Sequence, residues 1–426
     1  MKKISTFIIA FIIFTEFSYS EFSDDLYIYG AAQTIFLNEN FQQSFSQNQL
    51  QQGGIIGQRI DSQDTSFNKN RNSFMTQQVN LFVNKFYEDK LNFFFDMQFN
   101  QNYNSSEDLG SFSIQEAWVN YKLSNQFQIK AGQLFPAFNN LNEVKNRLNL
   151  LNYLFRPIVY EKILSDVISS EDFIPETAFL QLHGQIPISN FFIDWAAYMG
   201  NSEGSFLISN TSPSSDGYLS GSDPNDLEKK LYGARIGLRT KKENFKIGVS
   251  GTRDYNDGNS YLKILKLDLV NDYPVLPIED QLRYRIGADL SANYKGFSIE
   301  SEYSFSHMED IIFKNSEFNI YSSDECWNRF YYVNLSYDIN DDIFTYIGYS
   351  EILIGILNFN SDSDYVTLGA GYRINPWLTL KAQFIAYQQQ VDYPILWENP
   401  QGERRPRLQT MKLKNSITIV GFSAQF

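Results

Sequence analysis

The feature that most constrains the fold of this chain is a series of short segments in which apolar and polar residues alternate. Residues 91–100 show the pattern most clearly, because every odd position is apolar and every even position except Phe94 is polar. Successive side chains of an extended chain point to opposite faces. The pattern therefore predicts β-strands that have one apolar face and one polar face.

Segments of this kind predict about 16 strands, an even number, arranged as one single strand, seven close pairs and a final single strand. In chain order they are Leu26–Leu37, Phe74–Phe86 with Leu91–Asn100, Phe112–Leu123 with Phe127–Leu134, Thr177–Ile186 with Asn190–Gly200, Lys230–Thr240 with Phe245–Asp254, Leu282–Tyr294 with Phe297–Met308, Phe330–Ile339 with Ile343–Leu353, Tyr365–Ile374 with Leu378–Gln388, and Lys414–Phe426.

The connections between these strands alternate between very short and very long. Short turns such as KKEN at Lys241–Asn244 alternate with long loops such as Asn38–Asn72, Phe135–Glu176 and Asn201–Lys229. Short periplasmic turns and long extracellular loops are typical of a transmembrane antiparallel β-barrel, whose closure requires the first strand to pair with the last. A soluble Greek-key sandwich, the alternative fold, mixes its connection lengths.

The amino terminus predicts export. Lys2 and Lys3 precede an apolar run from Ile4 to Phe17, which is followed by small residues up to Ser20. This order is typical of a secretory signal peptide, so we expect residues 1–20 to be removed and residues 21–426 to form the barrel. No later window holds roughly 20 uncharged apolar residues, so a transmembrane helix is not expected. Cys326 is the only cysteine and excludes an internal disulfide.

The net charge of −14 argues against a nucleic-acid partner, because such binding needs clustered Lys and Arg. The chain has only two histidines, His183 and His307, and neither has a Ser or Asp constellation or a Cys/His metal cluster at a meaningful spacing. We therefore expect no enzyme activity, no cofactor and no metal.

The last strand ends on Phe426, with Phe422, Val420 and Thr418 on the same apolar face. A terminal Phe that closes such a strand resembles the signal by which outer-membrane β-barrel proteins are recognised for assembly. Phe422 and Phe426 are the candidate assembly signal. The resemblance implies the barrel-assembly machinery, outer-membrane lipid and lipopolysaccharide as partners.

The loop Phe135–Glu176 is expected to contain a short amphipathic helix that ends before Pro157. Leu141, Val144, Leu148 and Leu151 recur at steps of three and four residues, and an apolar face of this kind must be buried against something. In a barrel, the nearest partner is the inner wall.

The stretch Glu116–Phe138 resembles a strand, turn, strand and Gly-Gln-x-x-x-Pro-Phe-like step of the phosphate-selective porin O/P superfamily. Gly132, Gln133, Pro136 and Phe138 carry the match, with one additional residue between Pro136 and Phe138. The resemblance implies an outer-membrane porin, a water-filled channel for passive diffusion of small hydrophilic solutes or ions. It also implies an inward-folded third loop and a homotrimer, while the acidic chain departs from a phosphate-selective pattern.

An inward-folded loop makes its charged residues candidates for the pore constriction, and each could instead be a solvated loop charge. They are Glu143, Lys145, Arg147, Arg156, Glu161 and Lys162.

Five basic residues on the polar faces of three consecutive strands form a candidate lumen patch. Such a patch would favour anions, whereas pairing with Asp289, Glu300 and Glu302 would only keep the lumen hydrated. The expectation is therefore a weakly anion-leaning or unselective pore. An adhesin or receptor barrel without a conducting pore is the alternative. The patch consists of Arg235, Arg239, Lys246, Arg283 and Arg285.

Overall fold

The computed structural model describes residues 26–47, 67–100, 111–147, 151–161, 173–202, 229–256, 281–308, 311–313, 321–323, 326–356, 359–398 and 404–426. The expected signal peptide, residues 1–20, lies outside these ranges. No helix among the described residues is long and apolar enough to cross a membrane.

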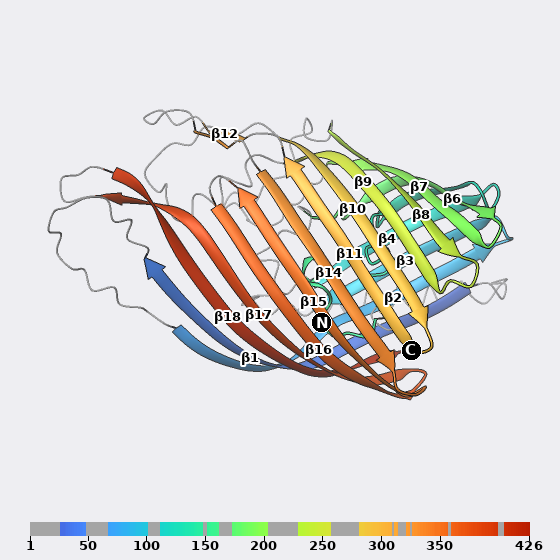
Figure 1. Cartoon of the computed structure of the whole chain (residues 1–426). Helices are drawn as coiled ribbons and strands as arrows, with labels where there is room; N and C mark the ends of the chain where they lie inside the picture. Colours follow the sequence, from blue (N-terminus) through green and yellow to red (C-terminus); the bar gives the residue numbers. More distant parts are fainter. Residues whose placement is uncertain are drawn as a thin grey trace, which may run out of the picture.

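Sixteen antiparallel strands form one closed barrel (Figure 1). Neighbouring strands of the barrel follow one another in sequence at all but two places, where β11 pairs with β14 and where β18 pairs with β1. A separate two-stranded hairpin, β12 with β13, lies between β11 and β14 in the chain. The barrel strands are β1 (Leu26–Gln47), β2 (Phe67–Tyr87), β3 (Leu91–Asn100), β4 (Ser111–Lys122), β5 (Gln128–Leu134), β6 (Ala178–Ile188), β7 (Phe191–Asn201), β8 (Lys230–Thr240), β9 (Phe245–Asn256), β10 (Gln281–Tyr294), β11 (Phe297–Met308), β14 (Cys326–Asp338), β15 (Ile343–Ile356), β16 (Phe359–Asn375), β17 (Leu378–Glu398) and β18 (Arg404–Gln425), and the hairpin strands are β12 (Ile311–Phe313) and β13 (Tyr321–Ser323).

The first and last strands close the barrel, as predicted. β1 pairs with β18 from Ala31 opposite Gln425 to Gln47 opposite Gln409, and Figure 1 shows the two strands side by side. The seam continues to the last residue, because the Gly30 amide donates to the Phe426 carbonyl (2.7 Å) and the Phe426 amide donates to the Gly30 carbonyl (3.1 Å). Closure leaves no open sheet edge at this seam, which is the condition for a sheet to stand in lipid.

The short turns are tight because single residues adopt left-handed backbone conformations. Glu88, Ser189, Glu243 and Lys295 all have positive φ, and each lies in or beside a connection between paired strands. Large aromatic side chains beside the turns, among them Phe191, Phe297 and Trp377, are exposed on the barrel. Exposed aromatic residues near a barrel end are typical of the girdle at a membrane interface.

The two faces of the wall differ in chemistry as the alternation predicted. On β8 and β9 the outward side chains Ile236, Leu238, Ile247 and Val249 are exposed. The inward positions between them are polar or glycine, and the polar side chains include Arg235, Ser250, Thr252 and Asp254, all buried. An apolar outer surface around a polar interior is the arrangement of a transmembrane barrel.

Candidate functional site in the barrel lumen

The chain leaves the wall at the end of β5 and enters the lumen. Gly132 has φ +122°, and a Cβ at this position would collide with the backbone of Ala117 and Trp118 on β4. The Gln133 side-chain amide donates to the carbonyls of Ile114 (2.9 Å) and Gln115 (3.3 Å). These two β4 residues lie beyond the end of the β4–β5 pairing, whose last pair is Ala117 and Gln133. Gly132 and Gln133, two of the residues that carry the resemblance in the sequence, therefore form the exit from the wall.

We call residues 135–147 and 151–161 the lumen segment. The helix predicted for this loop is wrong for the described residues, because residues 139–146 form turns and only Ile158–Tyr160 forms a short 3₁₀ helix, η2. Asn139 has positive φ, and the Leu141 amide donates to a wall side chain instead of to a helical carbonyl. Burial of Leu141 and Leu151 is confirmed, at 1% and 7% exposure.

The lumen segment packs against an apolar sector of the inner wall that the sequence did not predict. A single buried cluster joins its side chains to inward residues of β14 to β18 and of β1. Within it the rings of Phe173 and Phe330 meet edge to face, as do those of Tyr153 and Tyr346. The wall members are Ile35, Leu37, Phe330, Tyr332, Phe344, Tyr346, Ile352, Tyr365, Ile385, Ile417 and Ile419.

A sequence signal for this sector existed. Ile417 and Ile419 share the face of β18 that carries Gly421 and Ser423, so the inward side of this strand changes from small and polar to apolar along its length. Inward apolar residues in a water-filled barrel would be exposed to water unless another part of the chain packed on them, and the lumen segment does so.

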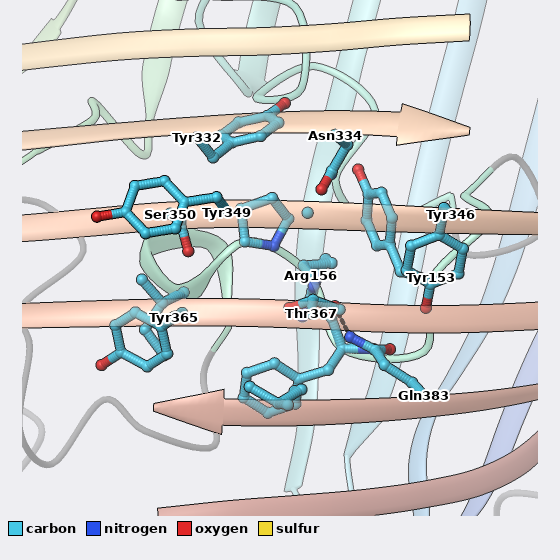
Figure 2. A pocket seen from close by; sticks show the side chains of 15 residues that line it. Tyr153, Arg156, Tyr332, Asn334, Tyr346, Tyr349, Ser350, Tyr365, Thr367 and Gln383 are labelled. Atoms are coloured by element: carbon cyan, nitrogen blue, oxygen red, sulfur yellow. Dashed lines mark hydrogen bonds between the residues drawn. The ribbon is translucent and has the colours of Figure 1, made fainter. Parts of the chain in front are cut away.

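Gln383 on β17 binds the backbone of the lumen segment much as a neighbouring strand would. Its side-chain oxygen accepts hydrogen bonds from the amides of Leu154 (2.9 Å) and Phe155 (2.8 Å), and its side-chain nitrogen donates to the Phe155 carbonyl (3.0 Å). Lys381 on the same strand donates to the Leu151 carbonyl (2.7 Å). Figure 2 shows the adjoining pocket, in which Gln383, Tyr153 and Arg156 lie with tyrosines of the wall.

Glu302 and Glu300 on β11 bind the lumen segment through neutral donors. Glu302 accepts from the Leu141 amide and the Tyr160 hydroxyl, each at 2.6 Å. Burial, followed by the charges of Glu300 and Glu302, raises the pKa of the Tyr153 phenol well above its usual range. Burial and then the charge of Glu302 raise the pKa of Tyr160 in the same way, so both phenols remain hydrogen-bond donors.

Of the six candidate constriction residues, three are buried between the lumen segment and the wall. Arg156 and Glu161 form an ion pair at 3.4 Å with side chains only 4% and 1% exposed. The Lys145 ammonium lies 4.4 Å from the centre of the Phe135 ring. Lys162 lies outside the described residues.

The other two candidates, Glu143 and Arg147, are partly exposed in the lumen. The Arg147 guanidinium lies 5.6 Å from the centre of the Phe94 ring on β3. The charge of Glu143 acts on His183 of β6 and Lys246 of β9. Both residues therefore lie on the side of the lumen segment that faces the polar part of the wall.

Four of the five residues of the basic patch have acidic partners. Arg235 pairs with Asp289 at 2.7 Å, as one of the two interpretations expected, and also donates to Asn140 of the lumen segment. Arg239 pairs with Asp194 at 2.7 Å. Arg283 and Arg285 share Asp254, a partner that the sequence did not suggest, at 2.6 and 3.4 Å. The patch is therefore largely neutralised.

Lys246, the fifth residue of the patch, has no ion pair within 4 Å among the described residues, and the same holds for Lys130 and Arg147. All three are partly exposed. The Lys130 ammonium lies 4.5 Å from the centre of the Trp118 ring. Trp118 ends a row of stacked inward rings on four neighbouring strands, with Tyr29, Phe82 and Phe94.

Two further groups of polar side chains stand out in the described part of the chain. The His183 Nε2 lies 3.0 Å from the Asn120 side-chain oxygen and so has a neutral partner. On β15 and β16, Glu351, Asp362 and Asp364 lie close enough to share a cation. Nothing else in the described surroundings of these three carboxylates points to an ion.

Comparison with protein families supports the resemblance found in the sequence. The family model described as phosphate-selective porin O and P matches residues 55–153. This region includes all of β2 to β5 and the first part of the lumen segment. No curated protein matches the chain.

Similar barrels occur among solved structures at low sequence identity. The outer membrane channel DcaP of Acinetobacter baumannii is 10% identical, with 94% of this chain and 97% of that chain covered and a TM-score of 0.48. An anion-selective porin from Comamonas acidovorans is 10% identical, with 94% of this chain and 99% of that chain covered and a TM-score of 0.47. The trimer form of OmpT from Vibrio cholerae is 10% identical, with 92% of this chain and 98% of that chain covered and a TM-score of 0.43.

Proposed function

We propose that this chain is a porin of the bacterial outer membrane, which forms a water-filled channel for passive diffusion of small hydrophilic solutes or ions. The observation that carries the proposal is a closed barrel with an apolar outer surface, a charged inner wall and a segment folded across the lumen. The match of residues 55–153 to a porin family supports it independently. The barrel acts as a channel rather than as an enzyme.

The permeation path runs along the polar sector of the wall. The inward faces of β14 to β18 are covered by the lumen segment, with Phe330, Tyr332 and Phe344 each at most 2% exposed. The partly exposed charges Lys130 and Lys246 lie on β5 and β9, and Glu143 and Arg147 are partly exposed charges of the lumen segment. We assign these four residues to the narrow part of the path.

The charge of this path favours anions weakly. Lys130, Lys246 and Arg147 are cations without an ion pair among the described residues. The acidic charges near them are the buried Glu116, close to Lys130 and Arg147, and Glu143, Asp289 and Asp194, close to Lys246. Arg235, Arg239, Arg283 and Arg285 add little, because acidic side chains neutralise them locally. A small cationic excess in a wide, hydrated path produces a modest preference and not a strict filter.

The short strand β5 supports a homotrimer. β5 has seven residues, fewer than the roughly 9–11 that a tilted strand needs to cross the hydrocarbon. Residues 111–116 of β4 consequently have no β5 partner. Of their backbone carbonyls, only those of Ile114 and Gln115 accept a hydrogen bond from the Gln133 side chain. Unpaired backbone groups are unstable in lipid, so this sector of the wall is suited to contact another copy of the chain.

Lipopolysaccharide and the barrel-assembly machinery complete the proposed partners. The apolar outer surface is suited to lipid, and the terminal Phe426 is suited to recognition because its ring is 64% exposed. Phe422 lies on the same strand with its ring exposed on the outer surface.

The proposal is tested by liposome swelling with neutral sugars of increasing size. A porin lets sugars enter at rates that fall steeply as the sugar approaches the width of the path. Liposomes that contain the folded protein and swell no faster than empty ones would instead favour the adhesin or receptor barrel.

A further inference from the structure

Both ends of the lumen segment are bound by one carboxylate. Leu141 near its start donates its backbone amide to one oxygen of Glu302, and Tyr160 near its end donates its hydroxyl to the other, each at 2.6 Å. Glu302 is 1% exposed and lies on β11, more than 140 residues away in sequence from both donors. One side chain of the wall therefore joins the start and the end of the lumen segment.

Glu302 takes part in none of the ion pairs found among the described wall residues. Its described partners are a backbone amide and a phenol, both neutral. The adjacent Glu300 likewise accepts from the Tyr332 hydroxyl at 2.5 Å and from the Tyr153 hydroxyl at 3.5 Å. Arg235, on the neighbouring sector of the wall, is bound to both oxygens of Asp289. A buried carboxylate without a cation is costly, so its hydrogen bonds to the lumen segment have to offset the loss of water.

The supports of the lumen segment are spread around the barrel. The chain leaves the wall at β5, meets Glu302 on β11 and meets Gln383 on β17, and these strands are separated by six, four and six steps around the barrel. Gln383 binds Leu154 and Phe155 of the lumen segment, which precede Tyr160 by six and five residues. Loss of Gln383 would therefore release the contacts at Leu154 and Phe155 alone, whereas loss of Glu302 would release one contact near each end of the lumen segment. Ser250 and Gln181 still bind residues beside Leu141, and Gln77 still binds Glu161.

We propose that Glu302 is the positioning residue that sets the width of the channel, by holding the lumen segment across the lumen. The inference rests on the proposed porin function. Glu302 acts through the lumen segment and not by contact with the permeating solute, because it is buried beneath Leu141 and Tyr160. Its loss should widen the path without opening the barrel wall, whose backbone pairing at Glu302 does not involve the side chain.

The experiment compares single-channel conductance and sugar cut-off for the full-length mature protein and four variants in planar bilayers and liposomes. Glu302→Ala removes both contacts, Glu302→Gln keeps one acceptor, and Tyr160→Phe removes only the contact at the end of the lumen segment. Gln389→Ala is the matched control, because Gln389 is also buried on the inner wall but donates only to Ser361 of the wall. Heat-modifiable migration in gels reports whether each barrel has folded.

We expect Glu302→Ala to raise conductance about twofold and to admit larger sugars, with smaller increases for Glu302→Gln and Tyr160→Phe and none for Gln389→Ala. A folded Glu302→Ala barrel with the conductance and cut-off of the unmodified protein would overturn the inference. If Glu302→Ala does not fold, Tyr160→Phe decides it in the same way.

The outcome for the unmodified protein separates this inference from the proposed function. If the unmodified protein is silent while Glu302→Ala conducts, the role of Glu302 is supported and the proposal of an open porin is wrong. If both are silent although both are folded, both proposals are wrong. If the unmodified protein conducts and the variants do not differ from it, only the inference fails.

Discussion

Gly132 determines where the chain leaves the wall, and a side chain there is excluded by two separate effects. Its φ of +122° is a conformation that L-residues avoid, at a cost of about 1–3 kcal/mol, and a Cβ would overlap the β4 backbone. We therefore predict that Gly132→Ala lowers the yield of folded, heat-modifiable barrel. Gly251→Ala is the control, because a Cβ there has its nearest contact at 3.6 Å. Equal yields for the two variants would contradict this role of Gly132.

Lys246 is the wall cation whose charge should affect permeating ions most directly. Reversing a charge about 10 Å from an ion in water changes its energy by about 0.8 kcal/mol before screening, so Lys246→Glu should lower the anion-to-cation permeability ratio roughly twofold. The reversal potential in a salt gradient measures this ratio. Lys242→Glu, which makes the same charge change on an exposed turn, should leave the ratio unchanged.

At the scale of single elements, the alternation of apolar and polar residues predicted the membrane-spanning strands well. The predicted bounds of Leu91–Asn100, Lys230–Thr240 and Phe297–Met308 coincide with β3, β8 and β11. β1, β17 and β18 each extend ten residues beyond the predicted bounds at one end, and β2 is eight residues longer than predicted. The missed parts, such as residues 38–47, lack the apolar face that lipid requires, so the pattern ends before the strand does.

The lumen segment was predicted less well, because tertiary contacts decide its conformation. The three- and four-residue spacing of Leu141, Val144, Leu148 and Leu151 correctly indicated burial of Leu141 and Leu151 but wrongly indicated a helix. Leu148 lies outside the described residues. The hydrogen bonds to Glu302 and Gln383 come from strands more than 140 residues further along the chain, and no local pattern contains them. Burial of Lys145, Arg156 and Glu161 likewise depends on the apolar inner wall.

The seam between β1 and β18 is the element whose last residue can be tested. Deleting Phe426 removes two backbone hydrogen bonds to Gly30 and the ring that lies against this glycine. We expect the deletion to reduce the amount of barrel assembled in the outer membrane several-fold, whereas Phe426→Tyr should assemble normally. Membrane fractionation with heat-modifiability measures both, and normal assembly of the deletion variant would contradict an essential role of Phe426.

At the scale of the whole molecule, the barrel has two unlike halves. The inner wall of β14 to β18 packs on the lumen segment like an ordinary protein core, while the wall of β3 to β9 keeps partly exposed charges. The apolar inward residues of β18 carried a signal for this division, but the segment that covers them could not be identified from the strand faces. The result is a path that is narrower and less central than a 16-stranded barrel alone would provide.

The weak wall at β5 predicts contact between copies. Ala131 is an exposed residue of β5, and Val249 is a comparably exposed, outward residue on β9. In a Cys326→Ser background, Ala131→Cys should form disulfide-linked dimers in membranes upon mild oxidation, whereas Val249→Cys should not. Equal cross-linking at both positions would argue that β5 does not face a neighbouring copy.

The most direct test of the channel itself is the current through the purified protein in a planar bilayer under a salt gradient. Discrete, stable conductance steps are predicted, with a reversal potential displaced slightly toward the value for anions. A folded barrel that gives no steps, or one with a strong cation preference, would contradict the account of a hydrated path bounded by Lys130, Lys246, Glu143 and Arg147.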